Sequence, residues 1–112
     1  MIVSGFNVYP IEVEDVIREV HGVAEAAVIG VDDELTGQAV VAYVVPREAG
    51  GDPEAAAGLS EAVAAHCAVR LARFKQPSRI EVVDELPLTV TGKVQKGRLR
   101  GLERRRSLGL LE

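Results

Sequence analysis

The sequence predicts a small α+β domain of two layers, in which a mixed sheet of roughly three strands packs against helices and a short N-terminal β turn precedes it. First, segments with strand patterns and segments with helical patterns alternate without a regular series of βαβ units. Second, 112 residues are enough for one domain with a single core. Third, 47% of the residues are apolar but only 4% are aromatic, so the core is aliphatic.

The chain is expected to open with a strand at Ile2–Val3, turned by Ser4-Gly5, and to continue into a helix over residues 10 to 20. Proline suits the first turn of this helix because its missing N–H is not needed there. The paired acids Glu12 and Glu14 are interpreted as charges at the helix start that complement the positive end of the helix dipole. One apolar stripe at helical spacing marks the buried face: Val13, Val16, Ile17 and Val20.

Two strands are expected next, from Val23 to Val31 and from Ala39 to Val45, and they are predicted to pair as a hairpin. The first strand is almost entirely apolar, which is typical of a strand covered on both faces. The segment between them is a polar turn over residues 32 to 37, and Pro46 ends the second strand.

The second half predicts a helix, a short third strand and a last helix. Residues 46 to 58 are rich in glycine and proline and are expected to form an exposed loop, with Ser60 as the N-cap of the following helix. The third strand is expected at Ile80–Val83, and the last helix is weakened by Gly97 and Gly101. Apolar residues four apart mark the buried stripe of the first of these two helices: Leu59, Val63, Cys67 and Leu71.

Composition limits the function classes. Cys67 is the single cysteine, so an intrachain disulfide is excluded. The apolar start lacks the basic flank of a signal peptide, and no apolar run approaches the ~18 residues that a membrane span needs. No ligand cluster has zinc spacing, so no metal site is expected in this chain. We expect a cytoplasmic protein, with a peripheral position at the membrane as the alternative.

Charge is distributed unevenly along the chain. Residues 1 to 54 hold eleven acids and two bases, whereas residues 55 to 112 hold six acids and eleven bases. A basic second half indicates an anionic partner. The run from Arg104 to Arg106 is interpreted as a solvated tail rather than as the contact itself.

Thr91-Gly92-Lys93 is the strongest candidate for chemistry. A glycine allows positive φ and a close approach of the backbone to a partner, and Lys93 projects a compact charge on a long stem. An ammonium group aimed at a reacting phosphate lowers the barrier to its transfer. Taken alone, however, such a tripeptide is more often an exposed loop with a solvated lysine.

Two motifs at the ends of the chain change that balance. Both motifs closely resemble the carboxy-terminal domain of the adenylate-forming enzymes. The late motif is Asp84-Glu85-Leu86-Pro87, followed by Gly92-Lys93 and Lys96, and the early one is Ser4-Gly5 with Asn7-Val8-Tyr9-Pro10. That family comprises acyl-CoA synthetases, peptide-synthetase adenylation domains and luciferases. The variant with Phe6 after Gly5 looks most like fatty acyl-CoA ligases.

The resemblance implies two sets of site residues. Lys93 would be catalytic, contacting the substrate carboxylate and the α-phosphate during adenylation, with Thr91 and Gly92 forming the phosphate turn. After the domain swings, the backbone around the first glycine would line the channel for the pantetheine thiol of coenzyme A. The channel residues implied are Gly5, Phe6 and Asn7, and the contacts to the nucleotide of coenzyme A are Phe74 and Lys75.

Phe74 also has a simpler interpretation, in which the ring plugs the end of a helix against the core. Both interpretations stay open from the sequence, because an aromatic ring can stack on adenine or pack against aliphatic side chains equally well.

The resemblance covers only the smaller of the family's two domains, so residues 1–112 are expected to be the mobile lid of a larger ligase. A larger N-terminal adenylation domain is then the main partner, and it would hold the Mg²⁺ ion, the adenine pocket and the acyl pocket. ATP, coenzyme A and a fatty acid or other carboxylic acid would be the substrates. We expect the isolated chain to fold but to lack ligase activity.

Three alternatives remain. The chain could belong to an amino-acid or aryl-acid adenylation domain, which shares the lysine motif. It could be a basic module that binds nucleic acid, although the acidic first half and the scarce aromatic residues oppose this. It could also be an interaction domain without chemistry.

Overall fold

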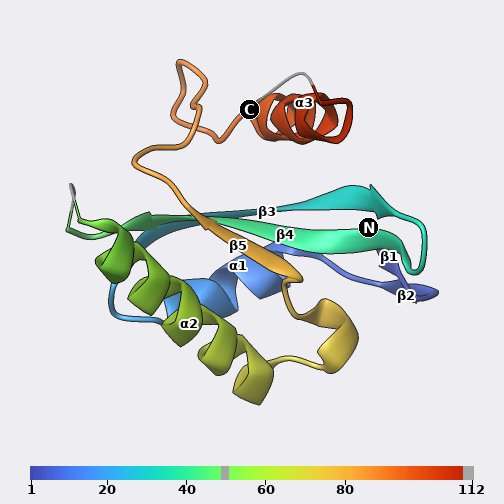
Figure 1. Cartoon of the computed structure of the whole chain (residues 1–112), viewed down its shortest axis with the longest axis horizontal. Helices are drawn as coiled ribbons and strands as arrows, with labels where there is room; N and C mark the ends of the chain where they lie inside the picture. The colour runs from blue at the N-terminus through green and yellow to red at the C-terminus, as the bar shows by residue number, and fades with distance from the viewer. Residues whose placement is uncertain (49–50, 110–112) are drawn as a thin grey trace.

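Helices cover both faces of a five-stranded sheet (Figure 1). The computed structural model describes residues 1–48 and 51–109. Within these residues, no helix is long and apolar enough to cross a membrane. The elements in chain order are β1 (Ile2–Val3), β2 (Phe6–Asn7), α1 (Pro10–Arg18), β3 (Val23–Asp33), β4 (Gly37–Pro46), α2 (Pro53–Arg70), the 3₁₀ helix η1 (Arg73–Lys75), β5 (Arg79–Val82) and α3 (Lys96–Ser107).

The sheet is built around β4, its central strand. β4 pairs with β3 as an antiparallel hairpin, from Pro46 opposite Val23 to Gly37 opposite Asp33. On its other edge, β4 pairs with β5 in parallel and with β1 through Val3. The predicted mixed sheet with three main strands is therefore confirmed, and the N-terminal β turn extends it by the short strands β1 and β2.

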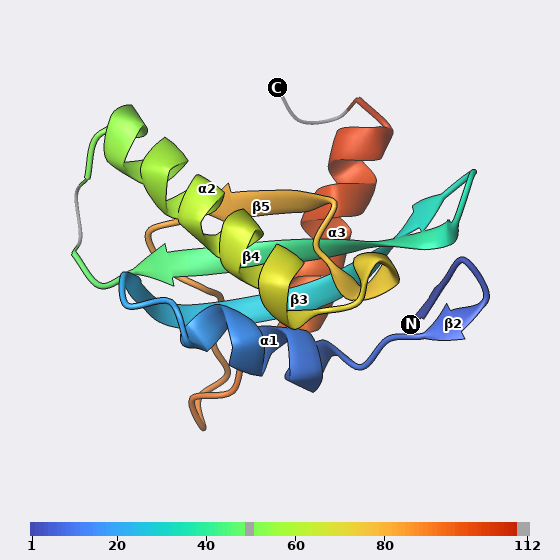
Figure 2. The ribbon, with the colours of Figure 1, turned by 90° about the horizontal axis from the view of Figure 1, so that it is seen from below.

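The core has two parts, one on each face of the sheet. α1 and α2 lie on one face and α3 lies on the other (Figures 1 and 2). The first part buries Ile17 and Val63, and the second buries Tyr43 and Leu99. β3 contributes to both parts, as its nearly continuous apolar run predicts. The α+β class is confirmed, and the two predicted layers become three because α3 covers the second face.

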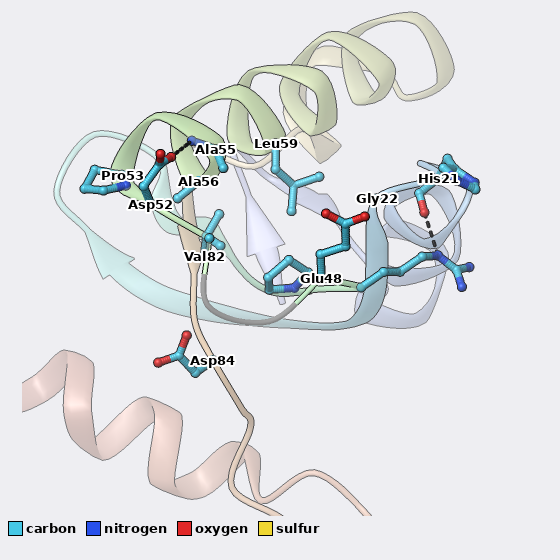
Figure 3. Close-up of a pocket in the computed structure, with 13 residues that line it drawn as sticks. His21, Gly22, Glu48, Asp52, Pro53, Ala55, Ala56, Leu59, Val82 and Asp84 are labelled. Atoms are coloured by element: carbon cyan, nitrogen blue, oxygen red, sulfur yellow. Dashed lines mark hydrogen bonds between the residues drawn. The ribbon is translucent and has the colours of Figure 1, made fainter.

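The start of α2 differs from the prediction. The helix begins at Pro53 and not near Ser60, so part of the expected loop is helical. The side chain of Asp52 accepts a hydrogen bond from the backbone N–H of Ala55 at 2.8 Å (Figure 3). Gly58, which suggested a loop, is tolerated inside the helix, where a Cβ would meet open space. A capping carboxylate followed by proline is a strong helix start, and it outweighs one glycine.

The other elements lie close to their predicted bounds. The apolar stripe of α2 is confirmed, since Val63 and Cys67 are buried and Leu71 is buried just after the helix ends. β3 and β4 are longer than predicted because polar residues of the turn join the antiparallel ladder. α1 ends at Arg18, slightly before the predicted bound.

Candidate functional site

Lys93 lies in a tight turn between β5 and α3, here called the lysine turn and comprising residues 88–94. Leu88 and Val94 form an antiparallel bridge, and the backbone N–H of Thr89 donates to the carbonyl of Lys93 at 2.7 Å. The N–H of Gly92 donates to the carbonyl of Thr89 at 2.9 Å. Gly92 has a φ of 87°, in the region that favours glycine, so this residue type allows the turn to close.

Two threonine hydroxyls tighten the lysine turn. The Thr89 hydroxyl accepts the backbone N–H of Lys93 at 3.1 Å and lies 2.9 Å from the hydroxyl of Thr91. Thr91 and Gly92, the predicted phosphate turn, are both exposed. Sequence reasoning missed Thr89, although threonine commonly bonds to nearby backbone groups in turns, which was the available signal.

The side chain of Lys93 is exposed and has no ion-pair partner within residues 1–48 and 51–109. Beside it, Val90 is fully exposed at the tip of the turn, and Leu88 is more than half exposed. The turn therefore presents one ammonium group together with an apolar tip. Such a combination suits contact with a surface that holds an anion.

The base of the lysine turn is held from several directions. Leu86 and Leu99 are buried in the core between the sheet and α3. The backbone N–H of Gln95 donates to the carbonyl of Pro87 at 2.8 Å. Lys93 is thus an exposed side chain on a backbone that packing and hydrogen bonds restrain.

Glu14 corrects the interpretation of the paired acids in α1. Glu12 is exposed, but Glu14 is only 6% exposed and faces the core. Its Oε2 atom accepts the backbone N–H of Val28 at 2.8 Å and lies 2.8 Å from Nζ of Lys96. The missed signal was the helical spacing, because Glu14 falls between Val13 and the next apolar positions of the same stripe.

A second group of predicted residues meets near the start of α1. The rings of Phe6 and Phe74 stack with centroids 4.6 Å apart and an angle of 26° between their planes. Nζ of Lys75 lies 5.7 Å from the centre of the Phe74 ring and 2.9 Å from a carboxylate oxygen of Glu12. We call Phe6, Phe74 and Lys75 the aromatic patch. It unites two motifs that are far apart in sequence and that were predicted to contact coenzyme A.

The glycine turn positions Phe6 for this contact. Ser4 has a φ of 52° and Gly5 a φ of 84°, and a two-residue loop with both φ values positive is the turn that matches the twist of an antiparallel hairpin. Gly5 and Asn7 are exposed. The half-buried ring of Phe74 packs on the core under α1 and α2, as the interpretation of this ring as a plug predicts.

The two groups of predicted residues do not form one site. Figure 1 places the lysine turn on the α3 side of the sheet and η1 on the side of α1 and α2, and both views keep the turn apart from β2. The ion pairs beside the two groups lie two residues apart on α1, where Glu12 pairs with Lys75 and Glu14 with Lys96. The arrangement is suited to two separate contacts made from different sides of the domain.

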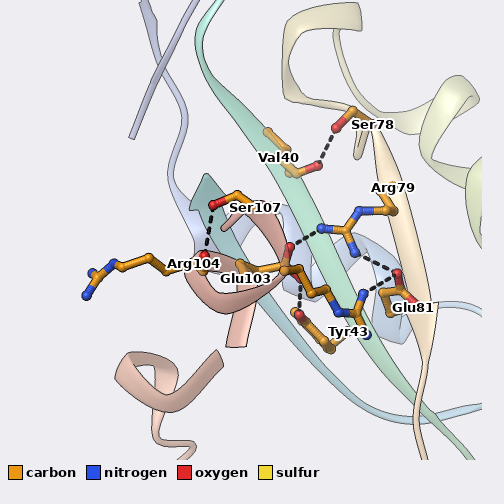
Figure 4. A network of polar contacts seen from close by, with 9 residues as sticks. Val40, Tyr43, Ser78, Arg79, Glu81, Glu103, Arg104 and Ser107 are labelled. Atoms are coloured by element: carbon orange, nitrogen blue, oxygen red, sulfur yellow. Dashed lines mark hydrogen bonds and ion pairs between the residues drawn. The ribbon is translucent and has the colours of Figure 1, made fainter. Parts of the chain in front are cut away.

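A network of polar side chains fastens α3 to the sheet (Figure 4). The hydroxyl of Tyr43 donates to Glu103, which also pairs with Arg79, and Arg79 and Arg106 both reach Glu81, at 2.6 Å and 3.1 Å. Burial alone would raise the pKa of Glu103, but hydrogen bonds from Arg79 and Tyr43 outweigh it and lower the pKa of this carboxyl. Burial, followed by the bond to Glu103, raises the pKa of the Tyr43 phenol.

Metal binding has no support in the described part of the chain. Residues 1–48 and 51–109 contain no group of three or more His, Cys, Asp and Glu side chains that could hold a metal ion. A hollow beside the start of α2 is lined by His21, Leu59 and Asp84 among others (Figure 3), and the predicted site residues lie elsewhere.

Comparison with known protein families gives one match over most of the chain. Residues 12–93 match the family model described as the AMP-binding enzyme C-terminal domain. The chain is 46% identical over 101 residues to an octahydro-indenyl propanoyl:CoA ligase of Mycobacterium tuberculosis, covering 90% of this chain and 19% of that protein. It is 41% identical over 103 residues to the long-chain-fatty-acid–CoA ligase of Yersinia pestis, covering 92% of this chain and 17% of that protein.

Solved structures agree with these matches. The crystal structure of an acyl-CoA synthetase from Brucella canis superposes with a TM-score of 0.82 at 34% identity, covering 95% of this chain and 19% of that one. The chain spans about a fifth of the length of the curated relatives that it matches.

Proposed function

The chain belongs to the family of AMP-binding enzyme C-terminal domains, and from this premise we propose that it acts as the mobile C-terminal domain of an ATP-dependent acyl-CoA ligase. The observation that carries this proposal is the lysine turn, where an exposed ammonium group stands on a backbone held by a glycine at positive φ. Residues 1–112 would then work together with a larger N-terminal adenylation domain, and would be inactive without it.

In the first half-reaction, a carboxylate oxygen of the acid attacks the α-phosphorus of ATP and pyrophosphate leaves. Negative charge gathers on the phosphate oxygens in the transition state. Lys93 would contact the carboxylate and the α-phosphate, with Thr91 and Gly92 close to the phosphate. Removal of one such preorganised contact typically costs about 10²–10³-fold in rate.

In the second half-reaction, the thiol of coenzyme A attacks the acyl carbonyl of the acyl-adenylate, the bond to phosphate breaks and AMP leaves as the thioester forms. The aromatic patch supports a role in this step, because a half-buried ring can stack on adenine and Lys75 can meet a phosphate of coenzyme A. Gly5, Phe6 and Asn7 would line the passage for the pantetheine arm. Since the lysine turn and η1 lie on different sides of the sheet, the domain would have to turn between the half-reactions.

The acid itself is chosen outside this chain. Among the relatives are ligases named for long-chain fatty acids, for 2-succinylbenzoate and for acetate, as in acetyl-coenzyme A synthetase. We place this domain with fatty-acid–CoA ligases, and an amino-acid or aryl-acid adenylation domain is the alternative. The Mg²⁺ ion would be held by the larger domain, and the complete enzyme would work in the cytoplasm or at the membrane surface.

The test separates the two half-reactions in the complete ligase. Lys93→Ala should lower the rate of acid-dependent pyrophosphate exchange about 10²–10³-fold, because the transition state loses its ammonium contact. Thioester formation from supplied acyl-adenylate should largely survive. Arg98→Ala is the matched control, since Arg98 is a nearby exposed base outside the proposed site. An equal loss in both half-reactions would contradict the role given to Lys93.

A further inference from the structure

Glu14 joins three parts of the fold, which are α1, β3 and the start of α3. It stands on α1, its Oε2 atom accepts the N–H of Val28 on β3 at 2.8 Å, and the same atom lies 2.8 Å from Nζ of Lys96 at the start of α3. α1 and α3 lie on opposite faces of the sheet (Figure 2). The ion pair between Glu14 and Lys96 therefore reaches around the edge of the sheet.

The edge in question is that of β3, which pairs only with β4 within residues 1–48 and 51–109. On the other side of this strand, side chains form hydrogen bonds with its backbone N–H and C=O groups. Glu14 accepts the N–H of Val28, Arg18 donates to the carbonyl of Ala26 at 3.3 Å, and Glu25 accepts the N–H of Ala26 at 2.9 Å. Edge strands need such protection against unwanted pairing. Only Glu14, among these three caps, also contacts α3.

Local helix energetics do not account for the pair. A lysine in the first turn of α3 opposes the helix dipole, and a carboxylate on the apolar face of α1 loses hydration. A buried ion pair contributes little net stability compared with apolar packing, and its best-attested role is to fix the relative position of elements. The pair is thus better explained by what it positions.

What it positions is the base of the lysine turn. Lys96 follows Lys93 by less than one helical turn, and the intervening backbone is tied to the other strand of the turn by Gln95 N–H, which donates to the carbonyl of Pro87 at 2.8 Å. We propose that Glu14 is a positioning residue, which holds Lys93 in its catalytic place through the ion pair with Lys96. This inference rests on the proposed function, because it assigns Glu14 to the adenylation step alone.

A displacement of a reacting group by about 1 Å can cost about 10²-fold in rate. Loss of the ion pair should therefore slow adenylation without removing the ammonium group of Lys93. It should leave the second half-reaction intact, because in the described part of the chain Lys75 of the aromatic patch pairs with Glu12 and not with Glu14.

Lys96→Met in the complete ligase tests this, since methionine keeps most of the apolar stem and loses the charge. We expect acid-dependent pyrophosphate exchange to fall about 10- to 10²-fold in kcat, with thioester formation from supplied acyl-adenylate unchanged. Lys96→Arg should restore most of the rate because it keeps the charge. Glu14→Gln should behave like Lys96→Met, and Glu25→Gln is the control for an edge cap that does not contact α3.

Each other outcome overturns the positioning role. A full adenylation rate in Lys96→Met would show that the pair does not matter to Lys93. An equal loss in both half-reactions, or the same loss in Glu25→Gln, would indicate a general structural effect. A loss in Lys93→Ala without one in Lys96→Met would overturn this inference alone, whereas full adenylation in Lys93→Ala would overturn the proposed function as well.

Discussion

Two charged residues hold helices against the sheet, although their residue type suggests exposed positions. Glu14 and Glu103 are charged, yet both are at least nine-tenths buried and each ties one helix to the sheet. Both occupy core-facing positions of their helices, where an apolar side chain is the usual choice. Because each is paired with a base and also hydrogen-bonded, the cost of burying its charge is offset.

Glu103 makes a prediction about acid stability. Its pKa is lowered from the ordinary value of 4.5, so the unfolded chain binds the proton more readily and the carboxylate contributes stability above about pH 4.5. Glu103→Gln should lose about 1–3 kcal/mol at pH 7, as expected when a buried charged hydrogen bond is broken. The difference from the unchanged chain should shrink as pH falls through the lowered pKa.

Urea unfolding of the 112-residue chain between pH 7 and pH 3 measures this difference. Glu19→Gln is a useful comparison, because Glu19 is an exposed carboxylate whose hydrogen bonds to Arg70 and His66 lower its pKa to about 2. Its contribution should begin to fall below about pH 4.5 and be lost by about pH 2, and solvent screening should make it smaller than that of Glu103. A constant gap between Glu103→Gln and the unchanged chain down to pH 3 would refute the role of Glu103 in this network.

At the scale of elements, helix ends were harder to predict than helix faces. The stripe containing Val63 and Cys67 identified the buried face of α2 correctly, because helical periodicity directly reports which side is buried. The start was wrong because two capping signals competed within a few residues. Asp52 followed by Pro53 is the stronger of them, since it combines a side-chain acceptor with a preset φ.

The capping difference can be measured by substitution. Asp52→Ala should lower the free energy of unfolding by about 1 kcal/mol, because the N–H of Ala55 loses its acceptor. Ser60→Ala should leave stability nearly unchanged or raise it slightly, since Ser60 lies inside α2, where alanine is the better helix former. Thermal unfolding of both variants decides the matter. A larger loss in Ser60→Ala than in Asp52→Ala would restore the start predicted from sequence.

At the scale of the whole molecule, the separation of the lysine turn from the aromatic patch is the main functional property. Sites far apart and without shared contacts usually respond to substitution independently, whereas residues that act as one unit do not. If the lysine turn serves adenylation and the aromatic patch serves thioester formation, changes in one group should not alter the step served by the other.

A double substitution in the complete ligase examines this independence. Phe74→Leu keeps an apolar side chain against the core but loses the ring, so the KM for coenzyme A in thioester formation should rise roughly tenfold, within the range of a lost aromatic–base stack. Adenylation should not change. Lys93→Ala combined with Phe74→Leu should adenylate like Lys93→Ala and form thioester like Phe74→Leu. Slower adenylation in Phe74→Leu alone would argue for one shared site.

The order of elements, the hairpin of β3 and β4, the buried stripe of α2 and the family-like lysine motif could all be predicted from the sequence. These features depend on residues that are neighbours along the chain, where propensity, periodicity and turn chemistry act directly. The positive φ of Gly92 belongs with them, because a turn that closes within a few residues needs glycine there.

Tertiary structure alone decided which side chains meet across the fold. The covering of the second face by α3, the stack of Phe6 on Phe74 and the pair of Glu14 with Lys96 join segments from opposite ends of the chain. A periodic pattern shows that one face of an element is buried but does not say what buries it. The partners are set by how the strands pair and by which face of the sheet each helix covers, and these are properties of the whole chain.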